Sequence, residues 1–175
     1  MKVIKTKIDG VLIIKPKIFG DERGFFLETF NAAKYAENGI TESFVQDNHS
    51  YSAKGVLRGL HFQKQYPQGK LVSVTQGVVF DVAVDIRQNS PTYGQWEGII
   101  LTAEEHTQFY VPPGLAHGFC VMSDVASFHY KCTEYYHPED EGCIRWDDPD
   151  IDIKWSVSKP TLSDKDANAG YLKDL

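Results

Sequence analysis

The sequence predicts a mainly β protein, built as an antiparallel sandwich or barrel with helices only as accessories. Short segments rich in Val, Ile, Phe, Tyr and Thr recur along the chain, and Gly, Pro, Asn and Asp separate them. They follow one another too closely for the crossover helices that parallel strands require. The predicted strands are residues 11–19, 24–30, 42–50, 55–63, 70–87, 93–102, 107–113, 118–123 and 125–136.

Two short helical segments interrupt this pattern. The first is residues 31–38, and the second is a turn that begins at Ser163 near the C-terminus. Asp166 follows Ser163 at the spacing of a capping box. We find no repeat, linker or low-complexity tract, so we predict a single domain over residues 1–175.

Composition and charge argue against several classes of partner. The 175 residues are 42% hydrophobic, which is enough to form a core without disulfides. The net charge of −6 repels nucleic acid and anionic membranes, so we expect neither as a partner. Residues 1–70 carry 11 basic and 7 acidic side chains, whereas residues 71–175 carry 7 and 17. An anionic small ligand should therefore bind the N-terminal half.

The cysteines and the N-terminus indicate a cytoplasmic protein. Cys120, Cys132 and Cys143 are odd in number and form no CxxC pair, as is typical of reduced thiols. The apolar run at residues 11–14 is too short for a signal peptide or a membrane span.

Alternation assigns the faces of the strand pattern at residues 80–86. One face consists of Phe80, Val82, Val84 and Ile86. The other face carries Asp81 and Asp85 on either side of Ala83. We expect the apolar face to point to the core and the carboxylates to lie on a polar face.

The strand pattern at residues 125–136 turns Tyr130 inward. Ala126, Phe128, Tyr130, Cys132 and Tyr136 share one face, opposite Ser127, His129 and Lys131. As a residue type alone, an inward Tyr130 is best explained as a core aromatic whose hydroxyl finds one partner.

Two segments carry polar residues in apolar surroundings. In residues 55–70, Arg58, His61, Gln63 and Lys70 stand on and just after an apolar strand, and His61 is the best candidate for a base. The alternative is a structural histidine. In the second segment His117 follows a Pro-Gly turn, where side chains commonly face a pocket.

Together these segments resemble the paired motifs of the cupin superfamily. Pro112, Gly114 and His117 match the second motif, which normally supplies one metal-binding histidine. In the first motif, Gln63 stands where a second histidine is usual and Lys70 stands where a glutamate is usual. An ammonium group cannot ligate a divalent metal. The sequence therefore predicts a metal-free site with a fixed cation in place of the metal.

Seven motifs in order extend the resemblance along the chain: GDERGFF, FVQDNHS, GVLRGLHFQ, VFDVAVDIR, SPTYG, VPPGLAHGF and LSDKD. In these motifs the chain resembles the dTDP-4-dehydrorhamnose 3,5-epimerase family. The resemblance implies a double-stranded β-helix jelly roll and a homodimer. It also implies cofactor-independent epimerisation at C3 and C5 of a dTDP-4-keto-6-deoxy sugar, a step of dTDP-L-rhamnose biosynthesis.

The resemblance also implies catalytic roles. His61 becomes the base, a role that suits histidine because the unperturbed pKa of its side chain is about 6.5. Tyr130 becomes the acid on the opposite face. Lys70, with Asp81 beside it, is placed against the C4 oxygen. Asp166 becomes the carboxylate that orients His61, although its pattern alone favours a helix cap.

The substrate-binding positions that the resemblance implies are Arg23, Phe26, Glu28, Gln46, Asp47, Asn48, Arg58, Lys70, His117, Tyr136, Glu141 and Lys165. Arg23, Arg58 and His117 would bind the diphosphate. Phe26 and Tyr136 would flank the thymine. Arg58 and His61 differ in parity, so both reach one pocket only if the strand bulges or twists at Gly59.

Three other interpretations of the sequence stay open. Some relatives of the family invert only C3 or only C5, or act on a related nucleotide 4-keto sugar, and one sequence does not separate these activities. A metal-dependent cupin would use His61 and His117 as ligands. A non-catalytic sugar- or nucleotide-binding barrel would use the same pocket without proton transfer.

Overall fold

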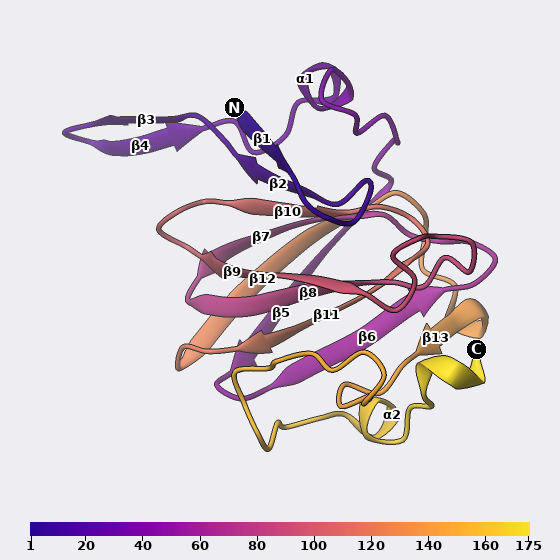
Figure 1. The fold of residues 1–175 in the computed structure, drawn as a ribbon. Helices are drawn as coiled ribbons and strands as arrows, with labels where there is room; N and C mark the ends of the chain where they lie inside the picture. The colour runs from indigo at the N-terminus through magenta and orange to yellow at the C-terminus, as the bar shows by residue number, and fades with distance from the viewer.

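Two antiparallel sheets stacked on each other form the body of the protein (Figure 1). The computed structural model describes residues 1–175. The six-stranded sheet runs in the order β1 (Lys2–Lys5), β2 (Leu12–Lys15), β10 (Gln108–Val111), β7 (Lys70–Gln76), β12 (Val125–Cys132) and β5 (Gln46–Ala53). The five-stranded sheet runs in the order β13 (Glu141–Cys143), β6 (Leu57–Gln63), β11 (Leu115–Val121), β8 (Val78–Asp85) and β9 (Trp96–Thr102). The mainly β, antiparallel prediction is confirmed.

The remaining elements are short. Strands β3 (Ile18–Asp21) and β4 (Gly24–Leu27) form a separate hairpin. The helices are α1 (Ala32–Ala36), α2 (Asp164–Ala167) and the 3₁₀ turns η1 (Pro138–Asp140) and η2 (Leu172–Asp174). Both predicted helical segments are confirmed, and side chains cap them at Asn31 and Ser163. None of these helices has the length and apolar character needed to span a bilayer.

The predicted strand at residues 70–87 is in fact two strands in different sheets. Strand β7 ends at Gln76 and β8 begins at Val78, so the chain passes from one sheet to the other at Gly77. Gly77 has φ +80°, and a Cβ there would lie 2.0 Å from the Val125 carbonyl oxygen. Only glycine fits this corner, which sequence alternation alone does not reveal.

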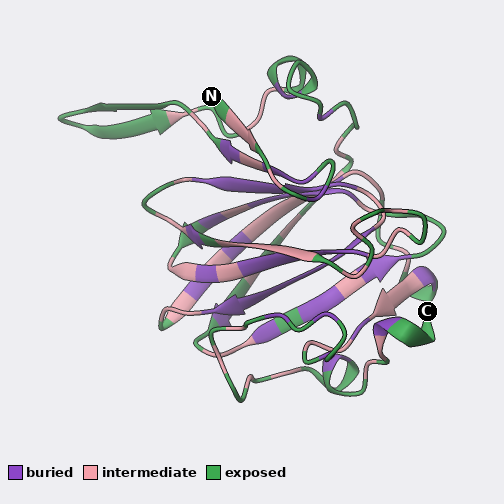
Figure 2. Cartoon of the chain, viewed as in Figure 1, coloured by how far each residue is buried: buried purple, intermediate pink, exposed green.

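Three apolar clusters hold the layers together. The largest, with residues such as Val72, Phe109 and Phe119, fills the space between the two sheets. A second lies outside the five-stranded sheet, where the C-terminal segment covers β8 and β6. A third lies where Tyr35 of α1 packs on the outer face of the six-stranded sheet. Both sheets are therefore buried along much of both faces (Figure 2).

This double burial reverses the predicted orientation of β8. Val82 and Val84 face outward under the C-terminal segment, whereas Ala83 belongs to the cluster between the sheets. Asp81 and Asp85, on the Ala83 face, are both fully buried. Burial alone would raise the pKa of Asp85, but hydrogen bonds from Arg87 and its neighbours hold that pKa well below its ordinary value. The prediction was wrong because a covered outer face is as apolar as a core face.

Strand β6 contains the bulge that the parity argument requires. His61 pairs with His117 and Arg58 pairs with Phe119, so Gly59 and Leu60 of β6 lie opposite the single residue Gly118 of β11. Gly59 lies at this point with φ +135°, and a Cβ there would approach the Gly118 Cα to 2.5 Å. Of the two alternatives that the sequence left open at Gly59, a bulge or a twist, the structure has the bulge, although Arg58 does not line the pocket.

Strand β12 has the predicted faces but ends early. Phe128 is buried between the sheets, and Tyr130 packs against the same cluster. The strand ends at Cys132, so Tyr136 lies in the following loop rather than on the strand. The inward orientation of Tyr130 is confirmed, whereas the strand assignment of Tyr136 was wrong.

Replacing Gly59 by alanine should destabilise the fold more than the same change at Gly55. Gly55 also has positive φ, at +79°, but a Cβ there would meet nothing within 4 Å. We expect Gly55→Ala to cost about 1 kcal/mol and Gly59→Ala about 2–4 kcal/mol of unfolding free energy. Urea denaturation of both variants measures the difference. Equal losses would mean that the approach to Gly118 contributes nothing.

Candidate active site

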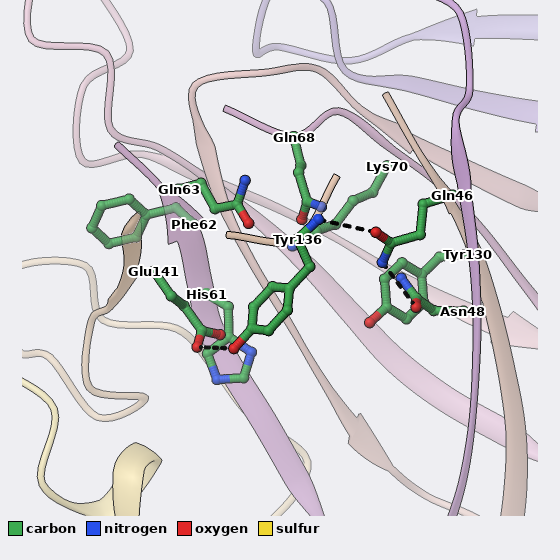
Figure 3. Close-up of a pocket in the computed structure, with 10 residues that line it drawn as sticks. All are labelled: Gln46, Asn48, His61, Phe62, Gln63, Gln68, Lys70, Tyr130, Tyr136 and Glu141. Atoms are coloured by element: carbon green, nitrogen blue, oxygen red, sulfur yellow. Dashed lines mark hydrogen bonds between the residues drawn. The ribbon is translucent and has the colours of Figure 1, made fainter. Parts of the chain in front are cut away.

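A polar pocket of about 280 Å³ opens between the two sheets (Figure 3). Strands β5, β6, β7, β12 and β13 and two loops contribute its walls. Its lining residues are Gln46, Asn48, His61, Phe62, Gln63, Gln68, Lys70, Tyr130, Tyr136 and Glu141. Three predicted catalytic residues, His61, Lys70 and Tyr130, thus share one pocket.

His61 on β6 is coupled to Asp166 on α2. The His61 Nε2 and Asp166 Oδ1 atoms are 2.6 Å apart, although the residues are 105 positions apart in the chain. Asp166 is 2% exposed. Burial by itself would raise the pKa of Asp166, but the hydrogen bond and charge interaction with His61 keep it below its ordinary value. The ionised carboxylate fixes the ring orientation and leaves Nδ1 free of protein partners.

The two sequence interpretations of Asp166 both describe the structure. Its backbone N–H donates to the Ser163 hydroxyl at 3.1 Å, which caps α2, while its carboxylate binds His61. The short helix therefore holds the backbone of Asp166 and frees its side chain for the pocket.

Tyr130 reaches the pocket from the opposite sheet. His61 belongs to the five-stranded sheet and Tyr130 to the six-stranded sheet, so their side chains approach from two sides (Figure 3). Burial, followed by the neighbouring Cys132, raises the pKa of Tyr130 to about 12. The phenol is therefore protonated at neutral pH and can act as a hydrogen-bond or proton donor.

Lys70 places a cation in the pocket wall. The residue is 8% exposed, and its Nζ has no hydrogen-bond or ion-pair partner in the protein. Burial lowers its pKa, while Cys132 and Asp81 favour the charged form. A buried ammonium without a partner is suited to bind an anionic oxygen.

Asp81 is close enough to Lys70 to act on its charge, but it does not line the pocket. Its Oδ1 lies 2.8 Å from His117 Nε2, and its Oδ2 is buried without a hydrogen-bond partner. The predicted polar face of β8 is the face turned between the sheets, so Asp81 is buried there. Asp81 acts on Lys70 through space as a buried negative charge.

Polar residues complete the rim of the pocket. The Tyr136 hydroxyl donates to Glu141 at 2.9 Å, and Lys165 Nζ donates to the same carboxylate at 2.7 Å. The Gln46 side-chain amide donates to Asn48 and accepts from the Tyr136 backbone N–H. These contacts fix the loop after β12 over the pocket.

The residues at the cupin metal positions do not fit a metal. The amide of Gln63 donates to the Tyr66 and Tyr135 carbonyls and accepts from the His137 N–H, so it is fully used. Lys70 brings a positive charge, and the ring of His117 is taken by Asp81. No cupin-type metal ligand set can form from these side chains.

Several predicted binding residues lie outside this pocket. Arg58 donates to the Ser52 hydroxyl and acts on Tyr130 only through space, and His117 is buried behind the wall. Asp47 points to the other face of β5, where it pairs with Lys131. Arg23 and Phe26 lie on the β3–β4 hairpin, and Glu28 follows it in an ion pair with Lys34.

Sequence reasoning missed other residues at the site. Phe62, Gln63 and Gln68 line the pocket, but none was assigned a binding role. Cys143 lies beside the His61–Asp166 pair, with its Sγ 3.7 Å from Asp166 Oδ1. Cys132 lies on the same face of β12 as Tyr130, as predicted, and it pairs with Lys70 of β7. The alternation along β12 placed this thiol on the inner face, but it did not indicate that Lys70 lies opposite.

Known proteins share this fold and sequence. A family model described as dTDP-4-dehydrorhamnose 3,5-epimerase matches residues 5–174. The protein of that name from Methanothermobacter thermautotrophicus is 55% identical over 99% of this chain and 95% of its own. The Escherichia coli protein of that name is 53% identical over 100% and 96%.

Solved structures agree in architecture. The Legionella pneumophila dTDP-6-deoxy-D-glucose-3,5-epimerase, crystallised with dTDP-4-keto-L-rhamnose, is 59% identical, with a TM-score of 0.96 over 98% of this chain and 93% of that one. A 3'-monoepimerase from Streptomyces bikiniensis, crystallised with dTDP-quinovose, is 34% identical, with a TM-score of 0.90 over 96% and 86%. The jelly-roll fold of the cupin type is thereby confirmed. On its full-length match in sequence and fold, the chain belongs to the dTDP-4-dehydrorhamnose 3,5-epimerase family of isomerases.

Proposed function

We propose that this protein epimerises dTDP-4-dehydro-6-deoxy-D-glucose at C3 and C5 to give dTDP-4-dehydro-L-rhamnose. One observation carries the proposal: His61 and Tyr130 approach one pocket from opposite sheets, with the buried cation of Lys70 in its wall. Inversion of a carbon needs a base on one side and an acid on the other. The family's name and the bound sugar of the Legionella pneumophila relative support the choice of substrate.

Proton transfer next to the C4 ketone accounts for each of these residues. His61 Nδ1 takes the hydrogen from C3 or C5 as a proton, and the electron pair moves onto the C4 oxygen. Asp166 stabilises the resulting imidazolium, because its carboxylate is held 2.6 Å from Nε2. Tyr130 then donates its phenolic proton to the other face of the same carbon, and the enolate returns to the ketone. No electrons are gained or lost, so the reaction needs no cofactor.

Lys70 stabilises the enolate in this mechanism. The negative charge develops on the C4 oxygen, and a preorganised donor at such a position contributes roughly 2.7–4 kcal/mol to the transition state. Asp81 and its partner His117 lie behind the wall, where Asp81 favours the charged form of Lys70. Gln46, Asn48, Tyr136 and Glu141 line the remaining pocket and are proposed to contact the substrate.

Proton NMR of dTDP-4-keto-6-deoxyglucose in D₂O tests the function directly. Exchange of both the C3 and C5 hydrogens, followed by appearance of the L-sugar, supports the proposal. Exchange at one carbon alone would identify a monoepimerase, the activity named for the Streptomyces bikiniensis relative. Binding without exchange would leave a sugar-binding barrel.

We further propose a homodimer in which the β3–β4 hairpin of one subunit contacts the other. The hairpin projects from the body, and its strands pair only with each other (Figure 1). Phe19, Phe25 and Phe26 on it are 52%, 61% and 70% exposed, an apolar patch of the kind that marks protein interfaces. Arg23 and Phe26 are outside the pocket of their own chain, so their substrate contacts require the pocket of a partner.

The cytoplasmic location stays a prediction.

His61→Asn should abolish exchange at both carbons while the fold survives. Asparagine keeps a polar group of similar size beside Asp166 but cannot accept the proton. A general base contributes about 10²–10⁴ in rate, so we expect turnover below about 1% of wild type. The NMR exchange assay measures turnover, and circular dichroism checks the fold. Higher residual turnover at either carbon would remove His61 from the role.

Tyr130→Phe should damage net epimerisation more than deuterium wash-in. Phenylalanine keeps the ring packing but cannot donate a proton, whereas His61 can still remove and return a hydrogen on its own face. The same NMR experiment reports both signals. Equal loss of both would show that Tyr130 only shapes the pocket.

Lys70→Met should lower kcat by about 10² or more with little change in dTDP affinity. In wild type, kcat should also fall as the pH rises, and this fall should begin below the usual lysine pKa of 10.5. The reason is that burial lowers the pKa of Lys70 and the neutral amine cannot stabilise an enolate. Tyr130, with its pKa of about 12, titrates later. Lys70→Arg should lack this basic limb. Weakened dTDP binding with unchanged kcat in Lys70→Met would instead assign Lys70 to the diphosphate.

Mixing two inactive variants tests the shared pocket. Arg23→Ala and His61→Asn proteins are purified separately, mixed in equal amounts and allowed to exchange subunits. Roughly a quarter of all pockets should then be active. After random exchange, half of the dimers contain one subunit of each variant. Each of these dimers has one pocket in which both His61 and Arg23 are intact. No recovery, with dimer exchange verified by native mass spectrometry, would mean that Arg23 serves its own chain or no pocket.

A further inference from the structure

Three side chains with metal-binding atoms, one of them the proposed base, lie close together. His61 comes from β6, Cys143 from β13 and Asp166 from α2, and their ligand atoms all lie within 4.8 Å of one another. His61 and Cys143 are direct partners across the β13–β6 pair. Asp166 Oδ1 lies 2.6 Å from His61 Nε2 and 3.7 Å from Cys143 Sγ. The proposed mechanism uses two of these residues and gives Cys143 no role.

We propose that His61, Cys143 and Asp166 form an inhibitory binding site for Zn²⁺ or a similar thiophilic divalent cation. One imidazole nitrogen, one cysteine sulfur and one carboxylate oxygen are the ligand types that zinc prefers, and the cysteine releases its thiol proton to solvent when it binds the ion. With Zn–N and Zn–O bonds of about 2.0 Å and a Zn–S bond of about 2.3 Å, tetrahedral ligands lie roughly 3.3–3.6 Å apart. The observed separations bracket this range, and small side-chain shifts bring all three atoms to it.

The site is both anchored and accessible. Asp166 is buried and Cys143 partly buried, so the ligands are held in place. The His61 side chain is 27% exposed and lines the pocket, so one of the three ligands is in contact with solvent. Lys165, the basic residue of α2, pairs with Glu141 at 2.7 Å, and this pairing reduces its repulsion of a cation.

Metal binding here would oppose catalysis. A zinc ion on Nε2 replaces the proton shared with Asp166 and leaves the Nδ1 nitrogen of neutral His61 protonated. That nitrogen then has no lone pair with which to take a proton from the substrate. This consequence rests on the proposed function, whereas metal binding itself does not. It is also the opposite of the metal-dependent cupin interpretation, in which a metal would support turnover.

Metal titration tests the site without any substrate. Protein freed of metal with EDTA and dialysed is titrated with Co²⁺, followed by absorbance, and with Zn²⁺, followed by calorimetry. Wild type should bind one ion per chain and show the thiolate-to-cobalt charge-transfer band. Cys143→Ser keeps a hydroxyl near Asp166 but should lose the band. It should also bind Zn²⁺ at least about tenfold more weakly, since even changes behind a metal ligand cost about 10–100-fold.

Cys120→Ala is the matched control, because it removes a fully buried thiol in β11 and leaves the three ligands intact. It should retain wild-type Zn²⁺ affinity and the cobalt band. Equal Zn²⁺ affinity in wild type and Cys143→Ser, or a cobalt spectrum without the thiolate band in wild type, would overturn the proposed site.

The exchange assay tests inhibition separately. Zn²⁺ should suppress turnover of wild type and Cys120→Ala, EDTA should restore it, and Cys143→Ser should need at least about tenfold more Zn²⁺ for half-inhibition. Mg²⁺, which prefers oxygen ligands, should have no effect. Binding that depends on Cys143 but leaves turnover unchanged would overturn the inhibitory role. If the metal-free protein shows no exchange, the proposed function fails, and the titrations alone decide the site.

Discussion

The close approach of β6 and β11 at Gly59 sets the geometry of the pocket. The additional residue in β6 lets the strand present Leu60 and Phe62 to the outer apolar cluster and His61 to the space between the sheets. It also turns Arg58 toward the side of Tyr130. A regular strand would place Arg58 with Leu60 and Phe62 instead. The orientation of Arg58 relative to His61 therefore depends on the close approach of Gly59 to Gly118.

The C-terminal segment is the second requirement. It covers the outer face of the five-stranded sheet with Ile151, Ile153 and Leu172, and it bridges to the body at Val56–Thr161 and Ile144–Gly170. This apolar anchoring brings α2 next to β6, and only then can Asp166 reach His61. A segment that appears peripheral in the chain thus supplies the carboxylate that orients the proposed base.

The space between the two sheets is apolar in one part and polar in another. One part is filled by Val72, Phe109 and other apolar residues, whereas the pocket contains a buried ammonium and lies near a buried carboxylate oxygen without a partner. Desolvated groups of this kind cost stability unless they are paired. Proteins tolerate such costs mainly where function needs them. For Lys70, the same burial that costs stability strengthens its interaction with an anionic oxygen.

Features set within a few residues could be read from the sequence. β-branched and aromatic runs identified the strands, Asn31 and Ser163 marked helix starts, alternation turned Tyr130 inward, and conflicting parity located the bulge at Gly59. The naming of a sugar substrate came from the family resemblance and not from spacing.

Features that depend on which surfaces meet were decided only by the tertiary structure. The orientation of β8 followed from a C-terminal segment that covers its outer face, and Asp81 consequently binds His117 inside the body. The proximity of Cys143 to Asp166 and the separation of Arg23 from the pocket arise in the same way. Local pattern reports that a side chain is apolar or polar, but not which distant segment will cover it. The sequence by itself therefore determined the strands and the candidate chemical groups, and long-range packing determined which of those groups meet.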